Sequence, residues 1–291
     1  MTEFFSAEKA LNEGIRRLTE AAVPDPETDA RLLLLDTIKL TPTRWLLERG
    51  RRLSDVEIRR YMDRIGQRAT GRPVQYILGS QPFMGLDFMV NENVLIPRFD
   101  TEVLAETVLR TVGPGPQEGL DLCTGSGCIA ISLTALSGGT YRMTATDLSE
   151  DALCVARENA RRLLPEGQRP VFYRGDLFDA LPAGRCFDWI VSNPPYIATE
   201  EIRSLDTAVK DFEPVTALDG GRDGLDFYRR IAAQAPDYLR RGGMLFLEIG
   251  EDQGETVPEL LRQCGWHEVR VMQDLAGLDR VVTARSSREE S

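Results

Sequence analysis

From about residue 101 onward, short apolar runs alternate with stretches of helical length. Seven of these runs have the length and composition of buried strands, at residues 119–123, 142–146, 171–174, 189–192, 244–249, 269–272 and 281–283. Such alternation is typical of domains in which helices cover both faces of a sheet. The sequence therefore predicts an α/β fold with a doubly wound, mostly parallel sheet.

The first part of the chain has helical periodicity instead. An apolar face runs from Leu11 to Ala22, and a second helix is expected to begin at Pro26 with Asp25 as its N-cap. A third helix is expected after the Ser-Asp-Val-Glu sequence that begins at Ser54, because this sequence fits a capping box. These helices predict a small bundle.

Between the helical part and the α/β part, short β-favouring pieces are separated by Gly79, Pro82 and Gly85. This pattern predicts a β-hairpin. We therefore expect three parts: a helical domain at residues 1–72, a β-hairpin linker at 73–96 and the α/β domain at 97–291.

The charge of the chain limits its partners. The formal net charge of -11 argues against general nucleic-acid binding, which needs Lys and Arg to neutralise phosphates. Arginine is nevertheless dense in one part of the N-terminal third (Arg44, Arg49, Arg51, Arg52, Arg59, Arg60, Arg64, Arg68 and Arg72). This cluster is either a solvated helix face or a patch that docks a partner.

The cysteines and the histidine argue against a metal site. The five cysteines form no C-x-x-C pair, and the single histidine, His267, cannot build a multi-histidine site. With no signal peptide, the odd cysteine count predicts reduced thiols in a cytoplasmic protein. No apolar run approaches the length that spans a bilayer, so no membrane partner is expected.

A glycine-rich turn follows the first strand of the α/β domain, in the sequence LDLCTGSGCIAISL. Gly125, Gly127 and Ala130 match the G-x-G-x-x-G/A pattern of nucleotide-binding loops, in which free N–H groups at a helix start face the ligand. The next strand ends in Asp147, placed to accept hydrogen bonds from ribose hydroxyls. Loop and acid together predict an adenosine-type ligand, and they do not separate NAD from S-adenosylmethionine.

Three further residues are candidates for contacts with this ligand. Asp121, just before the loop, could orient the turn or meet an ammonium group of the ligand. Asp176, after the third strand, could accept from an adenine amino group, and Leu177 could line the adenine ring. The alternatives for these last two are a helix cap and a core leucine.

The fourth strand ends in Asn-Pro-Pro-Tyr, at the carboxyl edge where open α/β sheets bind ligands. Asn193 offers a side-chain carbonyl, and Pro194 offers a backbone carbonyl held by fixed φ angles. Tyr196 supplies a flat ring. Two acceptors in a rigid fork suit a planar NH2 group, whose nitrogen could then attack a methyl group carried by S-adenosylmethionine. Proximity, orientation and electrostatics would supply the rate, with no metal and no histidine.

With this motif, the sequence resembles the amino-group methyltransferases, which share the signature (N/D)-P-P-(Y/F/W). More narrowly, it resembles the release-factor glutamine methyltransferases, the PrmC/HemK family. The resemblance covers nearly the whole chain, in the blocks RPVQYILGSQPFMGLDFMVNENVLIPRFDTE, DLCTGSGCIAISL, TDLSEDAL, GDLF, VSNPPYI, EPVTALDGGRDGLDFYRRI, EIGEDQG and DLAGLDRVV.

The resemblance implies a fold and an activity. The fold is a Rossmann-like, seven-stranded class I methyltransferase domain, joined by a β-hairpin to a helical N-terminal domain that helps grip the substrate. The cofactor is S-adenosylmethionine, and the product is S-adenosylhomocysteine. The substrate is the side-chain amide of the glutamine in the Gly-Gly-Gln motif of class 1 peptide chain release factors.

The resemblance also implies roles for individual residues. Asn193 and Pro194 would hold the glutamine amide, while Pro195 and Tyr196 shape its slot. Phe99 would form a wall of the active site. The cofactor would be held by a set of residues that includes the whole loop (Cys123, Thr124, Gly125, Ser126, Gly127, Asp147 and Leu177). Many relatives have glycine where this chain has Cys123 and larger groups at Leu177, and inert packing is the expected role of Cys123.

Other functions use some of the same residues. An adenine-N6 nucleic-acid methyltransferase would also present an NH2 group to this motif, but the net charge and the lack of a basic recognition domain count against it. A methyltransferase of a ribosomal-protein glutamine would use the same pair of acceptors for the amide. A catalytically idle docking module would not need the intact loop, and an NAD dehydrogenase would not explain Asn-Pro-Pro-Tyr.

Overall fold

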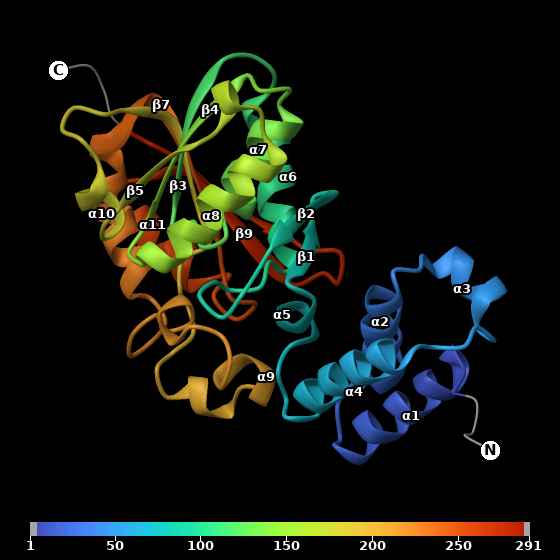
Figure 1. Ribbon diagram of the computed structural model, residues 1–291. Helices are drawn as coiled ribbons and strands as arrows, with labels where there is room; N and C mark the ends of the chain where they lie inside the picture. The colour runs from blue at the N-terminus through green and yellow to red at the C-terminus, as the bar shows by residue number, and fades with distance from the viewer. Residues whose placement is uncertain (1–4, 288–291) are drawn as a thin grey trace. The chain divides into compact units, whose positions relative to one another are not determined.

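The computed structural model describes residues 5–287. The chain divides into two compact units, one formed by Met1–Gly79 with Asp206–Phe212 and the other by Ser80–Leu205 with Glu213–Ser291. Figure 1 shows the elements of both units along the chain. Among the described residues, no helix combines the length and apolar character that a bilayer crossing requires.

The first unit is helical. Its helices are α1 (Ala7–Glu20), α2 (Pro26–Ile38), α3 (Pro42–Glu48), α4 (Asp55–Ala69), α5 (Val74–Leu78) and α9 (Thr207–Lys210). Leu18, Leu33, Tyr61 and Ile65 are fully buried where α1, α2 and α4 meet. Leu11 and Leu18 of the predicted apolar face are therefore buried as the periodicity predicts, whereas Ala22 is exposed and lies beyond the end of α1, with φ 55°.

The N-termini of α2 and α4 can be compared with the N-caps predicted from the sequence. The capping box of α4 is confirmed, because Ser54 and Glu57 exchange side-chain and backbone hydrogen bonds. Pro26 does begin α2 and Asp25 does occupy the N-cap position, but the Asp25 side chain makes no capping hydrogen bond. Asp25 has φ -121° and ψ 64°, which is outside the β region that a capping side chain usually requires.

Two short helices differ from the sequence-based expectation. Residues 74–78 form α5 where short β pieces are expected, and the helix ends at Gly79, whose φ of 80° is left-handed. Helix α3 has no buried residue, so it lacks the apolar periodicity that would predict it. The hairpin itself is confirmed, in β1 (Ser80–Phe83) and β2 (Leu86–Met89).

Several arginines of the N-terminal cluster are used inside the helical unit. Arg68 pairs with Asp29 at 2.6 Å, and both side chains are buried. Arg64 pairs with Asp36, and Arg51 pairs with Glu57. These three guanidinium groups therefore hold the unit together rather than forming part of an open basic patch.

The second unit contains a seven-stranded sheet. The strand order is β5-β4-β3-β6-β7-β9-β8, with β9 antiparallel to both neighbours and all other pairs parallel. All seven predicted strands are present, as β3 (Gln117–Leu122), β4 (Tyr141–Asp147), β5 (Val171–Arg174), β6 (Phe187–Ser192), β7 (Leu239–Glu248), β8 (His267–Gln273) and β9 (Asp279–Arg285).

Helices cover both faces of this sheet (Figure 1). One layer has α6 (Asp100–Val112), α7 (Cys128–Leu136) and α8 (Glu150–Leu163), and the other has α10 (Asp226–Tyr238) and α11 (Thr256–Gln263). Along β6, Trp189 and Val191 lie in the first core and Ile190 lies in the second. This alternation follows from the two-residue period of a strand and confirms the doubly wound arrangement.

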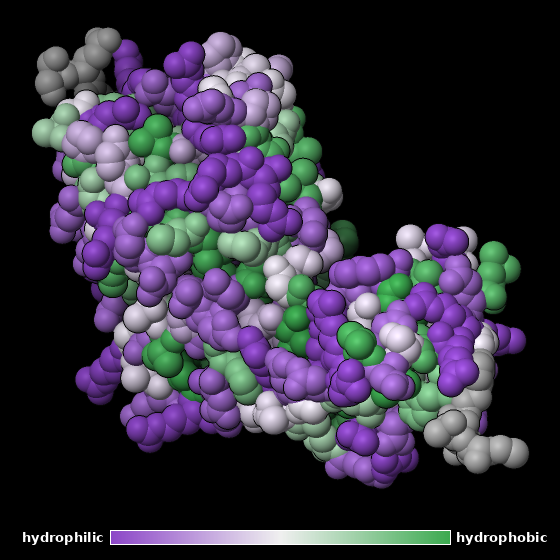
Figure 2. Space-filling model, viewed as in Figure 1, coloured by the Kyte–Doolittle hydropathy of each residue, from purple (hydrophilic) through white to green (hydrophobic). Residues whose placement is uncertain are grey.

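Short 3-10 helices complete the unit, at Glu166–Gln168, Leu177–Ala180, Glu201–Ser204 and Val215–Ala217. In Figure 2, hydrophilic side chains cover much of the visible surface, and hydrophobic ones are scattered among them. Most large apolar side chains lie inside one of the three cores.

Candidate active site

The central strands of the sheet bring the predicted site together at one edge. Leu122 of β3 is in register with Thr146 of β4 and with Ser192 of β6. The glycine loop, Asp147 and Asn193 follow these residues directly, so they emerge side by side at the carboxyl edge. The chain winds outward in opposite directions from β3 and β6, and such a switch point is where α/β sheets bind ligands.

A cavity of about 360 Å³ opens at this edge. Seven of the residues selected from the sequence line it: Cys123, Gly125, Asp147, Asp176, Leu177, Asn193 and Pro195. The structure brings these together from four different strand ends. The others selected (Asp121, Thr124, Ser126, Gly127, Phe99, Pro194 and Tyr196) are not among its lining residues, although most adjoin ones that are.

The glycine loop has a left-handed backbone at three positions. The φ angles are 58° at Cys123, 53° at Gly125 and 81° at Gly127. A Cβ at Gly125 would meet no heavy atom within 4 Å, whereas one at Gly127 would lie 2.9 Å from Ile131 Cδ1 and 3.1 Å from Ala156 Cβ. Gly125 therefore leaves open space beside the cavity, and Gly127 permits close packing of α7 and α8.

Asp147 holds the loop from the neighbouring strand. Its Oδ2 accepts a hydrogen bond from the N–H of Gly125 at 2.8 Å, and its Oδ1 accepts from the N–H of Ser149 at 2.9 Å. Burial raises the pKa of Asp147, and these N–H donors oppose that shift. Each carboxylate oxygen can accept a second bond, so ribose hydroxyls remain within its capacity.

Asp121 lies fully buried beneath the loop. Its Oδ2 accepts from the Thr124 hydroxyl at 2.6 Å, which confirms that it orients the turn. Its Oδ1 has no hydrogen-bond partner among the described residues. Burial raises the pKa of Asp121 to about 7. The Thr124 hydroxyl and the Ala130 N–H oppose this shift, and a buried acceptor without a donor is costly.

The end of β5 forms another wall of the cavity. Asp176 pairs with Arg230 at 2.8 Å, and its side chain makes no helix-capping bond, so the cap alternative is wrong. Leu177 has a φ of 50° and is buried. A left-handed conformation is strained for leucine, and such strain is concentrated at ligand sites.

Cys123 faces the same cavity. Burial raises the pKa of its thiol, and the nearby carboxyl of Asp147 adds to the shift. The thiol therefore stays protonated and is a poor nucleophile, which supports an inert role.

The Asn-Pro-Pro-Tyr turn is held by hydrogen bonds on its far side. Ile197 donates its N–H to Leu218 at 3.0 Å and accepts from the N–H of Gly220 at 2.8 Å. The Asn193 Nδ2 donates to the Thr101 hydroxyl at 3.2 Å. Burial raises the pKa of Tyr196, so its ring stays neutral. Phe99, by contrast, is 68% exposed at the start of α6.

Some lining residues were not selected from the sequence. They are Asn93, Val94, Leu95, Leu148, Ser149, Ala152, Pro214, Thr216, Ala217, Phe227 and Arg230. Many of them belong to the blocks VNENVLIPR, TDLSEDAL and EPVTALDGGRDGLDFYRRI, which carry the family resemblance. They come from segments far apart in the sequence, and several are small or apolar residues of types that do not by themselves signal a ligand contact.

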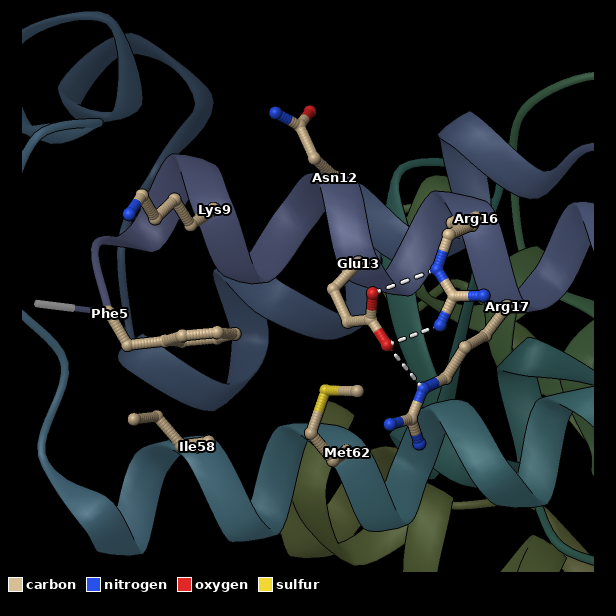
Figure 3. Close-up of a pocket in the computed structure, with 8 residues that line it drawn as sticks. All are labelled: Phe5, Lys9, Asn12, Glu13, Arg16, Arg17, Ile58 and Met62. Carbon is tan, nitrogen blue, oxygen red and sulfur yellow. Dashed lines mark hydrogen bonds and ion pairs between the residues drawn. The ribbon is translucent and has the colours of Figure 1, made fainter. Parts of the chain in front are cut away.

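A second hollow, of about 540 Å³, lies on the helical unit between α1 and α4 (Figure 3). Phe5, Ile58 and Met62 form its apolar side. Glu13 accepts hydrogen bonds from Arg16 and Arg17, which lower its pKa to about 2. The Glu13 carboxylate is thus already engaged, whereas the cavity at the sheet edge is lined by residues of the glycine loop.

Solved structures with a similar fold include methyltransferases. A methyltransferase from Pyrococcus furiosus matches with a TM-score of 0.53 at 20% identity, covering 69% of this chain and 89% of that one. A T. thermophilus 16S rRNA N2 G1207 methyltransferase, in complex with AdoMet and guanosine, matches with a TM-score of 0.51 at 16% identity, covering 71% and 49%. The sheet order, the glycine loop and the acidic strand ends define the second unit as a class I S-adenosylmethionine-dependent methyltransferase domain.

Sequence comparison identifies the particular family. The PrmC N-terminal domain matches residues 9–79, and the methyltransferase small domain matches residues 98–212. A release factor glutamine methyltransferase of Geobacter sulfurreducens is 40% identical, over 97% of this chain and 98% of that protein. Another, of Moorella thermoacetica, is 43% identical, over 95% and 97%. The chain belongs to the release factor glutamine methyltransferase family.

Proposed function

We propose that this chain methylates the side-chain amide N5 of the glutamine in the Gly-Gly-Gln motif of class 1 peptide chain release factors, with S-adenosylmethionine as methyl donor. The observation that carries the proposal is the juxtaposition of a fixed Asn-Pro-Pro-Tyr turn and a nucleotide-type cavity at one sheet edge. The family supplies the identity of the substrate.

The residues of the cavity fit the proposed cofactor. The loop from Cys123 to Gly127 would receive it against open space at Gly125, and the unpartnered Oδ1 of Asp121 would meet its ammonium group. Asp147 would accept from the ribose, and Asp176 and Leu177 would border the adenine. When bound, S-adenosylmethionine supplies an electrophilic methyl group.

The residues of the turn would prepare the nucleophile. The Asn193 Oδ1 and the Pro194 carbonyl would each accept one N–H of the glutamine amide. Pro195 and Tyr196 would shape the slot around the amide, and the exposed ring of Phe99 would cover its outer side. Holding both hydrogens aims the nitrogen lone pair and draws it out of conjugation. The amide nitrogen would gain the methyl group as the bond between that group and the sulfonium sulfur breaks, leaving S-adenosylhomocysteine, and it would lose one proton to solvent.

The whole release factor is the proposed partner, and the cytoplasm is the proposed compartment because release factors act there. We also propose that the helical unit contacts the factor outside the Gly-Gly-Gln motif. The exposed side chains of Leu46 and Leu47 on α3 support this role, because they are 72% and 87% exposed.

The test is transfer of a labelled methyl group from S-adenosylmethionine to purified class 1 release factor. A ribosomal protein, DNA and RNA, assayed in parallel, represent the alternative substrates. Labelling of the release factor alone is expected. Labelling of nucleic acid or the ribosomal protein in its place would agree with binding of an NH2 group by the turn, but it would refute the release factor as substrate.

A further inference from the structure

The orientation of the Asn193 side chain decides whether the turn can accept a hydrogen bond. An asparagine amide can present either its oxygen or its NH2 group to a ligand, and only the oxygen can accept. Asn193 lines the cavity, so one end of its amide faces the site. The protein groups that hydrogen-bond the buried end of the amide determine whether its oxygen or its NH2 group faces the ligand.

The buried side of the amide meets two polar side chains. Asn193 Nδ2 donates to Thr101 Oγ1 at 3.2 Å, from the first turn of α6. Ser192 is in register with Leu247 of β7, so Asn193 and Glu248 emerge next to each other at the sheet edge. Thr101 is 2% exposed and Glu248 is 1% exposed, so water does not satisfy these groups.

The donors and acceptors of these three side chains can be paired in one consistent way. The Thr101 hydroxyl accepts from Asn193, which leaves its own proton to donate. A charged Glu248 carboxylate can only accept. Burial raises its pKa, and the Thr101 hydroxyl and the Asn193 NH2 group, placed to donate to it, lower that pKa. This pairing therefore directs the Asn193 NH2 group toward the protein and leaves Oδ1 as the acceptor for a ligand.

The backbone of the turn is fixed independently of these groups. Gln253 Nε2 donates to the Tyr196 carbonyl at 3.1 Å. Gln253 Oε1 accepts from the N–H of Gly250 at 2.9 Å and lies 3.2 Å from the Tyr228 hydroxyl. With the main chain held in this way, rotation of the Asn193 amide is the remaining freedom.

We propose that Thr101 and Glu248 are positioning residues, which together hold the Asn193 amide with its oxygen toward the substrate. The inference rests on the proposed function, because the oxygen matters only if an NH2 group is bound there. It also gives a role to the acid of the EIGEDQG block, which does not line the cavity.

Glu248 is placed to respond to pH. Burial raises its pKa to about 7, while Thr101, Arg280 and Asn193 favour the charged form. The titratable and charged groups that face it are Arg280 on β9, Asp100 on α6, Tyr196, Tyr228 on α10 and Cys128 on α7. Its Oε2 has no hydrogen-bond partner among the described residues. Protonation removes the negative charge of the carboxylate and adds a donor, which weakens its attraction for the Thr101 hydroxyl and the Asn193 NH2 group.

The direct test observes the Asn193 side chain by NMR in the full chain. The protein has five asparagines, so selective 15N-asparagine labelling gives few side-chain signals, and Asn193→Ala identifies the relevant one. We expect this signal to shift between about pH 5.5 and 8.5 as Glu248 titrates. The shift should persist in Thr101→Ser and vanish in Glu248→Gln. A signal that is independent of pH in the wild type, or that still responds in Glu248→Gln, would overturn the assignment.

Kinetics with release factor test the consequence. Thr101→Val should lower kcat about tenfold, the usual effect of one lost hydrogen bond, with little change in KM or in affinity for S-adenosylhomocysteine. Thr101→Ser keeps the hydroxyl and should stay within about twofold of the wild type. Equal losses in both variants, or none in Thr101→Val, would contradict the positioning role.

The pH profile separates Glu248 from other buried acids. Wild-type kcat should fall below about pH 7, and Glu248→Gln should lack this acidic limb. Asp121 titrates in the same range, and a limb that survives in Glu248→Gln would assign the pH dependence to Asp121 instead and overturn ours. If the wild-type enzyme labels no release factor, the proposed function fails, and the NMR result alone then decides this inference.

Discussion

Replacing Gly125 by alanine should weaken cofactor binding far more than it destabilises the protein. A Cβ at this position meets no heavy atom within 4 Å, so the folded chain has room for it. The remaining cost is the left-handed backbone, with φ 53°, which amounts to about 1–2 kcal/mol for a residue other than glycine. The same methyl group would project beside the cavity, where it excludes a ligand that approaches the backbone closely.

Gly127 provides the matched control. Its φ of 81° carries a similar backbone cost, and a Cβ would also press on Ile131 at 2.9 Å and Ala156 at 3.1 Å. Crowding of this kind costs a further 1–3 kcal/mol or so, so Gly127→Ala should lose roughly twice as much stability as Gly125→Ala.

The assays are urea unfolding and calorimetric titration with S-adenosylhomocysteine. We expect Gly125→Ala to raise the dissociation constant more than about tenfold, or more than 1.4 kcal/mol, at a modest loss of stability. Gly127→Ala should show the opposite balance. Wild-type affinity in Gly125→Ala would refute the placement of the cofactor against this loop.

Three further predictions follow from the site. Asn193→Ala should abolish most methyl transfer at nearly normal S-adenosylhomocysteine affinity, whereas Asp147→Ala should weaken that affinity first; calorimetry beside a transfer assay separates the two, and equal losses of both would contradict the roles. Arg98→Ala should destabilise the protein by about 2–3 kcal/mol because it strands the buried Glu213 carboxyl, whose pKa burial already raises. Added Glu213→Gln should restore most of the loss in urea unfolding, and no restoration would refute the pairing. The raised pKa of Glu248 means that the folded state binds the Glu248 proton more tightly than the unfolded state does. This proton therefore adds to the free energy of unfolding below about pH 4.5, and its contribution is lost as pH rises to about 7. Glu248→Gln should flatten this part of the stability–pH curve, and an unchanged slope would assign it to another group.

The fold could be predicted largely from local pattern. The central strands β6 and β7 carry continuous apolar runs at residues 189–191 and 244–247, because strands buried on both faces need apolar side chains. The edge strands β5 and β8 are mixed and partly exposed. The errors fall where local pattern is weak. Residues 74–78 (VQYIL) carry β-favouring side chains, yet they form α5, where Val74 and Tyr76 are buried. In so short a segment, tertiary burial decides the conformation rather than propensity.

The parts of the site that short local motifs form could be predicted from the sequence. Glycines in a strand-to-helix turn, an acid at the next strand end and Asn-Pro-Pro-Tyr are local signals that register then brings together. Thr101 could not be found in this way, because it contacts Asn193 across 92 positions of the chain. Arg230 likewise reaches Asp176 from a different helix. Such contacts depend on how elements pack, and a single sequence does not display this.

Strain at the cavity was also hidden from the sequence. Cys123 and Leu177 have φ angles of 58° and 50°, although neither residue type favours the left-handed region. Cys123 directly follows β3, and Leu177 begins the 3-10 helix after β5. Both angles therefore belong to connections at the ends of strands, where the path of the chain depends on the fold. Cys123→Gly is therefore the substitution that local geometry favours at this loop.

The most direct test of the central claim is to locate the methyl group by mass spectrometry of release factor treated with the enzyme and S-adenosylmethionine. Parallel samples use a factor whose Gly-Gly-Gln glutamine is replaced, and the Asn193→Ala enzyme. We expect one added methyl group on the side chain of that glutamine, and none in either parallel sample. A methyl group on another residue, or one that persists in both, would contradict the account.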